Sequence, residues 1–457
     1  MSRRLVIEGA AVATVDEAGT EYDRGHLVAV DGVITAVGPG ATPALSDGLP
    51  TRRVDGSGCL LTPGLVNTHH HLYQWATRGL AVDEALFQWL RALYPVWAEL
   101  GATEVRAATR AGLGWLALSG CTTSADHHYV FPRDAGDLLA VTVEAATEIG
   151  LRFHPCRGSM DLGASAGGLP PDDLVEDIDA VLTATEQAIT RHHDPSPAAM
   201  TRVGVGPCSP FSVSTQLLTA SAELARAHGV RLHTHLAETA DEERYCQRTY
   251  GCTPVEYLDS LGWLGPDTWL AHGVHLDDAA VKRLGATGTA VAHCPSSNAR
   301  LGAGMARVRD LLDAGVPVGL GVDGAASQEA GLLVEELRQA LYTARLRGGP
   351  AALTAREALA MATRGGARLL GRDGELGSLQ PGLLADLALW RLDGLGHADI
   401  ADPVTALVLG PPAPLRLLTV AGTPVVTDGV LATADPTALA RELRAANRRL
   451  RMRTETR

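Results

Sequence analysis

The chain has 457 residues, enough for one α/β barrel with a smaller appended domain. Acidic residues exceed basic ones by 52 to 39, and the formal charge of −13 argues against a nucleic-acid-binding surface. No apolar stretch reaches the roughly 20 residues of a membrane span, and the seven cysteines are scattered without a CxxC pair. We therefore expect a cytoplasmic protein with reduced thiols, which acts on a small molecule rather than on nucleic acid or a membrane.

The first segment, residues 1–58, has the pattern of a small β-domain. Short apolar runs predict strands at Leu5–Ile7, His26–Val30 and Val33–Val37. Asp31 and Gly32 stand between the last two runs and predict a tight hairpin turn.

Residues 59–370 change to short apolar strands separated by helical stretches, which predicts an α/β fold of the (β/α)8 TIM-barrel type. The eight candidate strands end near His69, Asp126, Arg157, Gly206, His235, His272, His293 and Asp323. In TIM barrels the chemistry lies at the C-terminal ends of the strands. Because most of these ends carry His, Asp or Arg, we expect them to form one site.

The last segment, residues 371–457, returns to strand character from Gly377 to about Val430. The basic stretch from Arg441 to Arg453 then predicts a solvated helix. Strand-rich segments at both ends of a barrel suggest that residues 1–58 and 371–457 fold together into one small β-sandwich domain.

A His-x-His pair ends the first apolar stretch of the barrel. Side chains two residues apart on a strand share a face, so His69 and His71 can grip one metal ion while His70 points away. Enzymes with such a clamp often hold two metals bridged by a carboxylated lysine. The only lysine, Lys282, lies in a charged, helix-like stretch and not at a strand end. The sequence therefore predicts a single metal.

Two further strand ends supply candidate ligands. His235 closes the strand Val230-Arg-Leu-His-Thr-His, whereas His233 on the same face lies one layer deeper and is a weaker candidate. Asp323 closes the last strand. Three imidazoles and one carboxylate suit Zn²⁺, and Fe²⁺ is compatible with the same donors. A catalytic site keeps a further position for water, whose pKa the metal lowers towards about 7.

Two side chains beside these ligands are candidates for proton transfer. Glu238 follows His235 by three residues, close enough to exchange protons between water and a substrate nitrogen. His272 can orient the attacking water or polarise the substrate, with a role as fifth ligand as the alternative. For His275 and His293 two roles are equally supported: a hydrogen-bond partner of a metal ligand, or an ordinary core residue.

The runs TPGLVNTHHH, HTHLAET, AHGVH, HCPSSN and GVDG resemble the amidohydrolase superfamily, in its deaminase branch with one metal. The stretches SGCTTSADHHY, CRGSM, GPCSPFSV and GWLGPDTWLAHG are similar to bacterial 8-oxoguanine deaminases. This resemblance implies that Glu238 and His272 form the acid–base pair. Asp323 would have a second role, taking the proton from the metal-bound water. The implied metal ligands are His69, His71, His235 and Asp323.

Candidate substrate contacts lie directly after the metal clamp. The aromatic residues Tyr73, Trp75, Phe87, Trp89, Tyr94 and Trp97 cluster there, and we expect most to pack in helices and one or two, such as Trp89, to stack on a planar ring. Gln74 offers an amide that both donates and accepts. Arg157 could face a substrate carbonyl, with a structural salt bridge as the equal alternative.

We therefore expect a hydrolytic deaminase of a small aromatic heterocycle, with 8-oxoguanine favoured over isocytosine, guanine and amino-triazines. A triazine amino- or chlorohydrolase is a related alternative. A cyclic amidase is disfavoured because the bridging lysine is missing. A non-catalytic binding protein is disfavoured because such a protein would be expected to have lost a ligand residue or Glu238, and the chain keeps all of them. We also expect a homo-oligomer.

Overall fold

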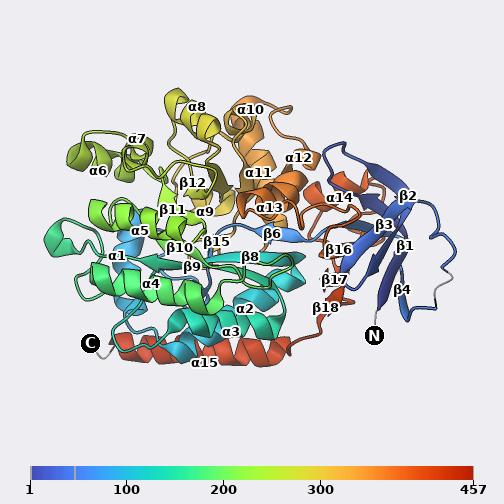
Figure 1. Cartoon of the computed structure of the whole chain (residues 1–457), viewed down its shortest axis with the longest axis horizontal. Coiled ribbons are helices and arrows are strands. Elements are labelled where there is room, and N and C mark those ends of the chain that lie inside the picture. Colours follow the sequence, from blue (N-terminus) through green and yellow to red (C-terminus); the bar gives the residue numbers. More distant parts are fainter. Residues whose placement is uncertain (1–2, 46–47, 456–457) are drawn as a thin grey trace.

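The computed structural model describes residues 3–45 and 48–455, and it contains a closed barrel and a separate sheet (Figure 1). All seven cysteines lie in the described residues and are free thiols, six of them buried. Within the same residues, no helix combines the length and the apolar character needed to cross a membrane.

Eight parallel strands close the barrel, which confirms the predicted TIM-barrel fold. In barrel order they are β6 (Leu65–Asn67), β8 (Cys121–His128), β9 (Arg152–Ser159), β10 (Gly204–Pro207), β11 (Leu232–Leu236), β12 (Thr268–His272), β13 (Ala290–His293) and β14 (Val318–Leu320). A short pair, β7 (His70–His71) and β15 (Asp323–Gly324), extends the ends of the first and last strands. Each predicted strand end therefore lies at or near an observed one.

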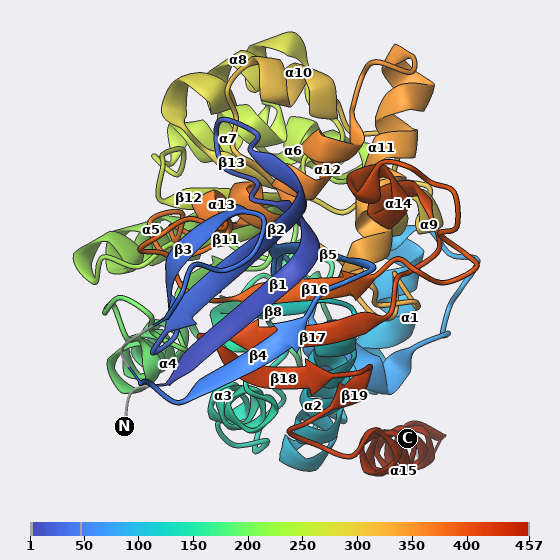
Figure 2. The ribbon, with the colours of Figure 1, turned by 90° about the vertical axis from the view of Figure 1, so that its right-hand side faces the viewer.

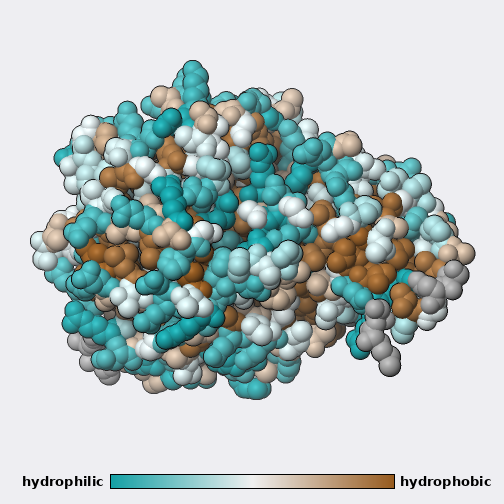
Figure 3. Space-filling model, viewed as in Figure 1, coloured by the Kyte–Doolittle hydropathy of each residue, from teal (hydrophilic) through white to brown (hydrophobic). Residues whose placement is uncertain are grey.

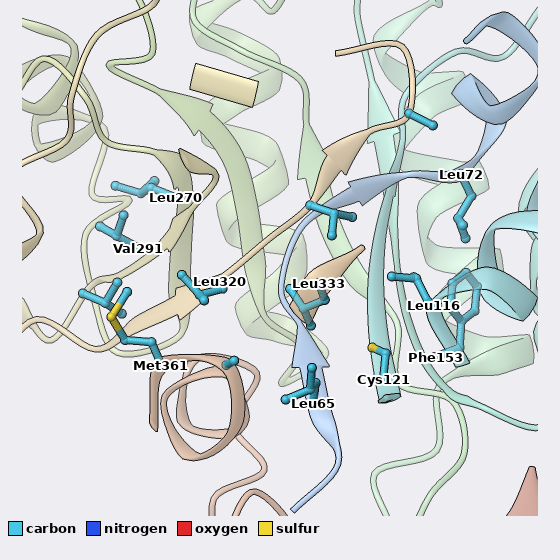
Figure 4. Packing of buried hydrophobic residues seen from close by; sticks show 14 of the residues in the cluster. Leu65, Leu72, Leu116, Cys121, Phe153, Leu270, Val291, Leu320, Leu333 and Met361 are labelled. Carbon is cyan, nitrogen blue, oxygen red and sulfur yellow. The ribbon is translucent and has the colours of Figure 1, made fainter. Parts of the chain in front are cut away.

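Helices between the strands cover the barrel. They are η1 (Leu72–Thr77), α1 (Leu86–Trp97), α2 (Ala102–Leu118), α3 (Leu138–Ile149), η2 (Ala164–Ala166), α4 (Ile178–His192), α5 (Thr215–Ala227), α6 (Ala240–Tyr250), α7 (Pro254–Ser260), α8 (Asp278–Thr287), α9 (Pro295–Arg300), α10 (Val308–Asp313), α11 (Leu333–Gly348), α12 (Ala355–Ala360), η3 (Met361–Gly365) and α13 (Gly366–Leu369). Their apolar sides bury one large core against the strands. Figure 4 shows part of it, where Leu116 of α2 lies beside Phe153 of β9.

The two ends of the chain meet in a second domain, as predicted, and its strands form one nine-stranded sheet within the described residues (Figure 2). The N-terminal strands are β1 (Arg4–Ala13), β2 (Glu21–Val30), β3 (Val33–Pro39), β4 (Thr51–Asp55) and β5 (Cys59–Pro63). The C-terminal ones are β16 (Leu387–Arg391), β17 (Leu415–Val420), β18 (Thr423–Thr427) and β19 (Val430–Leu431). The predicted hairpin is present, since Asp31 and Gly32 both adopt positive φ between paired strands.

One strand departs from the sequence-based expectation. The stretch from Cys59 was expected to open the barrel, but β5 pairs with β1 and β16 in the terminal sheet. The barrel begins only with β6, after a turn at Gly64, where an added Cβ would lie 2.2 Å from the Thr122 side chain. The division of the chain at residues 58 and 370 stays a prediction.

The C-terminal helix also differs from its prediction. Helix α15 (Pro436–Glu455) is longer than expected and packs along α2 instead of being solvated all round (Figure 1). Its buried side chains include Leu439 and Leu450, and Arg449 donates to the buried carboxylate of Glu104 on α2 at 2.7 Å. The remaining short helix is α14 (Pro403–Leu409).

The face of the molecule in Figure 3 is largely hydrophilic, with hydrophobic areas over one end of the barrel and over the terminal sheet.

Candidate active site

The C-terminal ends of the strands bring together a buried group of histidines and carboxylates. Ligand atoms of His69, His235, His272 and Asp323 all lie within 4.8 Å of one another. The same holds for a second, overlapping set made of His69, His71, His127 and His235. The two sets share His69 and His235, so they describe one site. Burial lowers the pKa of His69, His127 and His235 well below the ordinary histidine value, so these rings are neutral.

Hydrogen bonds fix which nitrogen of each predicted ligand carries the proton. The Nδ1 of His71 donates to the His127 carbonyl at 2.7 Å, and the Nδ1 of His235 donates to the Cys208 carbonyl at 2.7 Å. Neutral rings that donate through Nδ1 present a lone pair at Nε2. In this tautomer the Nε2 atoms of both rings are acceptors.

His233 fixes the third ring. Its Nδ1 donates to the Trp269 carbonyl at 2.9 Å, so its Nε2 accepts from the Nδ1 of His69 at 2.8 Å. The Nε2 of His69 is then another acceptor, and within the described residues it is buried without a hydrogen-bond partner. His233, the weaker ligand candidate, thus lies behind the predicted ligand His69 and orients its ring, as outer partners of metal-binding histidines do.

These acceptors face one another. The Nε2 atoms of His71 and His235 are 3.0 Å apart, and one oxygen of Asp323 lies 3.3 Å from the Nε2 atoms of both His69 and His71. Four electron-rich atoms at such distances repel each other unless a cation lies between them. Three imidazole nitrogens and one carboxylate oxygen therefore fit a divalent metal ion.

The Asp323 carboxylate is held from its other side. Its Oδ2 accepts hydrogen bonds from the hydroxyls of Ser297 at 2.5 Å and Ser327 at 3.0 Å. Burial alone would raise the pKa of Asp323, but the adjacent His69 and His71 outweigh it and hold this pKa well below its usual range. The carboxylate is therefore ionised, with Oδ1 directed at the histidines.

Glu238 and His272 lie side by side at the edge of this cluster. The Nε2 of His272 is 3.7 Å from the Glu238 carboxyl, and the Nδ1 of His272 contacts the Asn298 amide oxygen at 3.0 Å. Burial, followed by the negative charge of Asp323, raises the pKa of Glu238 well above its ordinary value. A carboxyl that holds its proton near neutral pH suits general acid–base catalysis.

Three residues at these strand ends adopt the left-handed backbone conformation that favours glycine. They are Ala237 at φ +53°, His272 at +75° and Asp323 at +62°. Such conformations cost free energy and persist where surrounding contacts enforce them, often at functional sites. The strain lies at the turns that carry all three predicted catalytic side chains.

A pocket opens onto the cluster, as expected of a site that binds a small molecule. Its lining comprises His71, Gln74, Leu86, Trp89, Leu90, Tyr129, Cys208, Phe211, His235, Glu238, His272, Leu301, Asp323 and Ser327. Gln74 and Trp89 thus lie where the sequence predicted. Gln74 accepts from the Ala326 amide at 3.4 Å, and a Cβ added at Gly324 would lie 1.8 Å from the Gln74 oxygen, so a larger residue there would displace this side chain.

Arg157 does not lie where the substrate-binding prediction placed it. Within the described residues, the pocket lining does not include this side chain. Its guanidinium forms a two-pronged ion pair with Glu176, at 2.6 and 2.8 Å, and lies over the Phe131 ring. The structure shows the structural salt bridge that the sequence left open as the alternative.

Several residues of the site carry little signal in the sequence. Tyr129 and Phe211 line the pocket from loops after strands, where no periodicity marks them. The sequence pattern does not predict His127 as a site residue, because the predicted strand ends near its neighbour Asp126, whose carboxylate accepts from the Leu72 amide. The run of histidines at 127–128 was the available signal. Of the two undecided histidines, His275 donates from Nε2 to the Ala303 carbonyl at 2.8 Å, and it is not among the described residues that line this pocket.

His293, the other undecided histidine, lies at the end of β13 and is buried. Neither ring nitrogen has a partner within the described residues. Lys282, which the single-metal prediction excluded from the site, is exposed on α8.

Known proteins resemble this chain over most of its length. Residues 60–427 match the family model described as Amidohydrolase family. The chain is 47% identical to an 8-oxoguanine deaminase of Pseudomonas aeruginosa over 92% of this chain and 94% of that protein. It is 36% identical to an isoxanthopterin deaminase from an unknown prokaryotic organism, over 97% of both chains.

Among solved structures, atrazine chlorohydrolase TrzN from Arthrobacter aurescens TC1, complexed with zinc, superposes with a TM-score of 0.91. The identity is 36%, and the match covers 97% of this chain and 100% of that one. The barrel, the acceptor cluster at its strand ends and these matches lead to one conclusion: the chain belongs to the amidohydrolase family.

Proposed function

We propose that this protein is a hydrolytic deaminase of small aromatic heterocycles and that 8-oxoguanine is its preferred substrate. One water and one 8-oxoguanine would give urate and ammonia, as the C–NH₂ bond breaks and a C–O bond forms at the same carbon. The observation that carries the proposal is the buried Glu238 carboxyl beside His272, at the point where the pocket meets the acceptor cluster. The two relatives described above, both named as deaminases, support the reaction class.

The acceptor cluster would hold one zinc ion through His69, His71, His235 and Asp323. The zinc in the related solved structure supports this choice, and Fe²⁺ suits the same donors. When bound, the metal would supply Lewis-acid chemistry and lower the pKa of water near the substrate.

The protein's own residues would manage the protons. Asp323, whose carboxylate is ionised, would accept the proton of the attacking water. Glu238, whose raised pKa keeps it protonated, would donate to the ring nitrogen next to the attacked carbon. His272, held by Asn298, would orient the water or the departing amine.

The pocket favours a planar ring with its amine between two ring nitrogens and beside a carbonyl. Trp89, Tyr129 and Phe211 provide aromatic surface, and the Gln74 amide can pair with such an edge. 8-Oxoguanine and isocytosine present this edge, whereas cytosine carries its amine elsewhere and a nucleoside adds a sugar. A wrong edge leaves buried polar groups unpaired and can cost factors of about 10⁴ or more in kcat/KM.

The test is ammonia release from a panel of 8-oxoguanine, isocytosine, guanine, cytosine, adenine, guanosine and a chlorinated triazine. We expect 8-oxoguanine or isocytosine to exceed cytosine, adenine and guanosine by a wide margin. A triazine amino- or chlorohydrolase is the second candidate, favoured by the likeness to the atrazine chlorohydrolase structure. Fastest turnover of cytosine or of the chlorinated triazine would overturn the proposed substrate. Location in the cytoplasm and homo-oligomerisation remain predictions from the sequence.

A further inference from the structure

Three helices of the chain begin with the same pattern, Thr-x-x-Glu, which normally forms a capping box. In α7, Thr253 caps the helix and Glu256 accepts from the backbone amide of Thr253 at 2.8 Å. In α12, Glu357 accepts from the amide of Thr354 at 2.8 Å. Both glutamates thus bind the residue that caps their own helix.

Helix α6 begins with the same pattern but pairs differently. Thr239 caps the helix through its hydroxyl, as expected, yet Glu242 reaches further back along the chain. Its two carboxylate oxygens accept from the amides of Ala237 at 2.8 Å and Glu238 at 2.9 Å. Glu242 is fully buried, whereas Glu256 is exposed. The departure from the ordinary capping box occurs at the turn that carries Glu238.

This turn is also held from its opposite side. The carbonyl of Ala237 accepts from the amides of Val274 and His275, both at 2.9 Å, just after His272. Ala237 itself has a φ of +53°, which a non-glycine residue adopts only when its surroundings enforce it. The peptide between β11 and α6 is therefore fixed by Glu242 on one side and by the end of β12 on the other.

From this geometry we infer that Glu242 is a positioning residue for the reaction: its carboxylate holds the strained Ala237–Glu238 turn so that the Glu238 side chain stays beside His272. The inference rests on the proposed acid–base role of Glu238. Glu242 does not line the pocket within the described residues, so it would act through Glu238 and not through the substrate.

A double-mutant cycle of Glu238→Gln and Glu242→Gln tests the inference. Glutamine at 242 keeps the size of the side chain but replaces one of the two accepting oxygens with an NH₂ group. We expect Glu242→Gln alone to lower kcat by about 10–100-fold, as is usual for partners behind a site residue, with KM and metal content little changed. In the Glu238→Gln background the same substitution should cause no further loss.

Glu256→Gln is the matched control, because it alters the same capping pattern outside the site, and its kcat should stay unchanged. If Glu242→Gln alone yields too little folded protein, the cycle is carried out with Ala237→Gly in all variants, since glycine adopts positive φ without strain. An equal loss from Glu242→Gln with and without Glu238 would overturn the inference while leaving the proposed function intact. Undiminished turnover of Glu238→Gln would instead overturn the acid–base role itself.

Discussion

Two groups of buried polar side chains lie at opposite ends of the barrel, and they differ in how completely they are paired. At the N-terminal end of β9, Arg152 donates to both oxygens of Asp386, at 2.7 and 3.0 Å, and to the carbonyls of Ala198 and Ala199. Asp386 also accepts from the Ala421 amide at 2.8 Å. This group joins the barrel to the terminal sheet, and its donors match its acceptors.

At the C-terminal end of the strands, acceptors outnumber donors. The Nε2 of His69 and the Nδ1 of His127 have no hydrogen-bond partner among the described residues, and the Nε2 atoms of His71 and His235 face each other. Both groups are buried, so burial alone does not distinguish them. Complete pairing marks a structural contact, whereas convergent acceptors without donors mark a site that needs a ligand.

The largest difference between the two groups should appear when a metal ligand is removed. His235→Ala should abolish turnover and metal binding, because the three remaining protein ligands no longer surround the ion. Asp386→Asn at the opposite end should leave both unchanged in the folded fraction. Elemental analysis should find about one divalent ion per wild-type chain. Two tightly bound ions per chain would contradict the single-metal site.

The second prediction separates proton transfer from metal binding at the same end of the barrel. Glu238→Gln should keep the metal and bind substrate, while turnover falls by about 10²–10⁴-fold, the usual contribution of a general acid–base. Steady-state kinetics and elemental analysis on the same preparation are the measurements. Loss of the metal in this variant would show that Glu238 is a ligand instead.

The third prediction concerns the buried ion pair of Arg152 and Asp386 at the opposite end of the barrel. Asp386→Ala leaves the Arg152 guanidinium buried without its carboxylate, and removing one partner of a buried ion pair costs about 3–5 kcal/mol of the free energy of unfolding. Urea denaturation measures this loss. Turnover per folded molecule should be unchanged, and a comparable loss of turnover would show that the two ends are coupled.

The fourth prediction uses pH. Burial raises the pKa of Glu336 from its ordinary value of 4.5 to about 7. Between these values the folded protein holds a proton that the unfolded chain has released, so the contribution to stability is present below pH 4.5 and is lost as pH rises through 7. This loss is about 3 kcal/mol, since each pKa unit is worth about 1.4 kcal/mol.

Glu336→Gln should therefore flatten the fall in unfolding free energy between pH 5 and pH 8, measured on metal-free protein. The decline should not vanish, because the pKa of Glu242 is also raised to about 7 by burial. An unchanged pH slope would contradict an ionisation at Glu336.

The smallest effect is expected at Arg157. Because Glu176 engages its guanidinium, Arg157→Lys should leave KM for the best substrate unchanged within error. A large increase in KM would restore Arg157 as a substrate contact.

The sequence predicted the barrel well because short apolar runs and polar strand ends recur along the chain. The four candidate ligands were predictable for the same reason, since each closes a strand and strand ends of a barrel meet. The structure brings these four together, with Glu238 and His272 beside them.

The rest depended on partners that no local pattern reveals. β5 looks like a barrel strand, but it pairs with β16, and the side chains of Thr62 and Trp390 that bond across this pair are 328 residues apart. The sequence left two roles open for Arg157 because its partner, Glu176, lies in a loop 19 residues further along the chain. His127 and Asp126 are neighbours on one strand, and only the closed barrel decides which of them faces the site.

The terminal sheet also has a consequence for synthesis on the ribosome. Strands β1 to β5 are made first, but β5 gains its neighbour β16 only after the whole barrel has been translated. Until then one long edge of the N-terminal strands is uncovered, and open strand edges invite pairing with other chains. We expect nascent chains that stop before Leu387 to associate with one another or with chaperones, even where their barrel strands are complete.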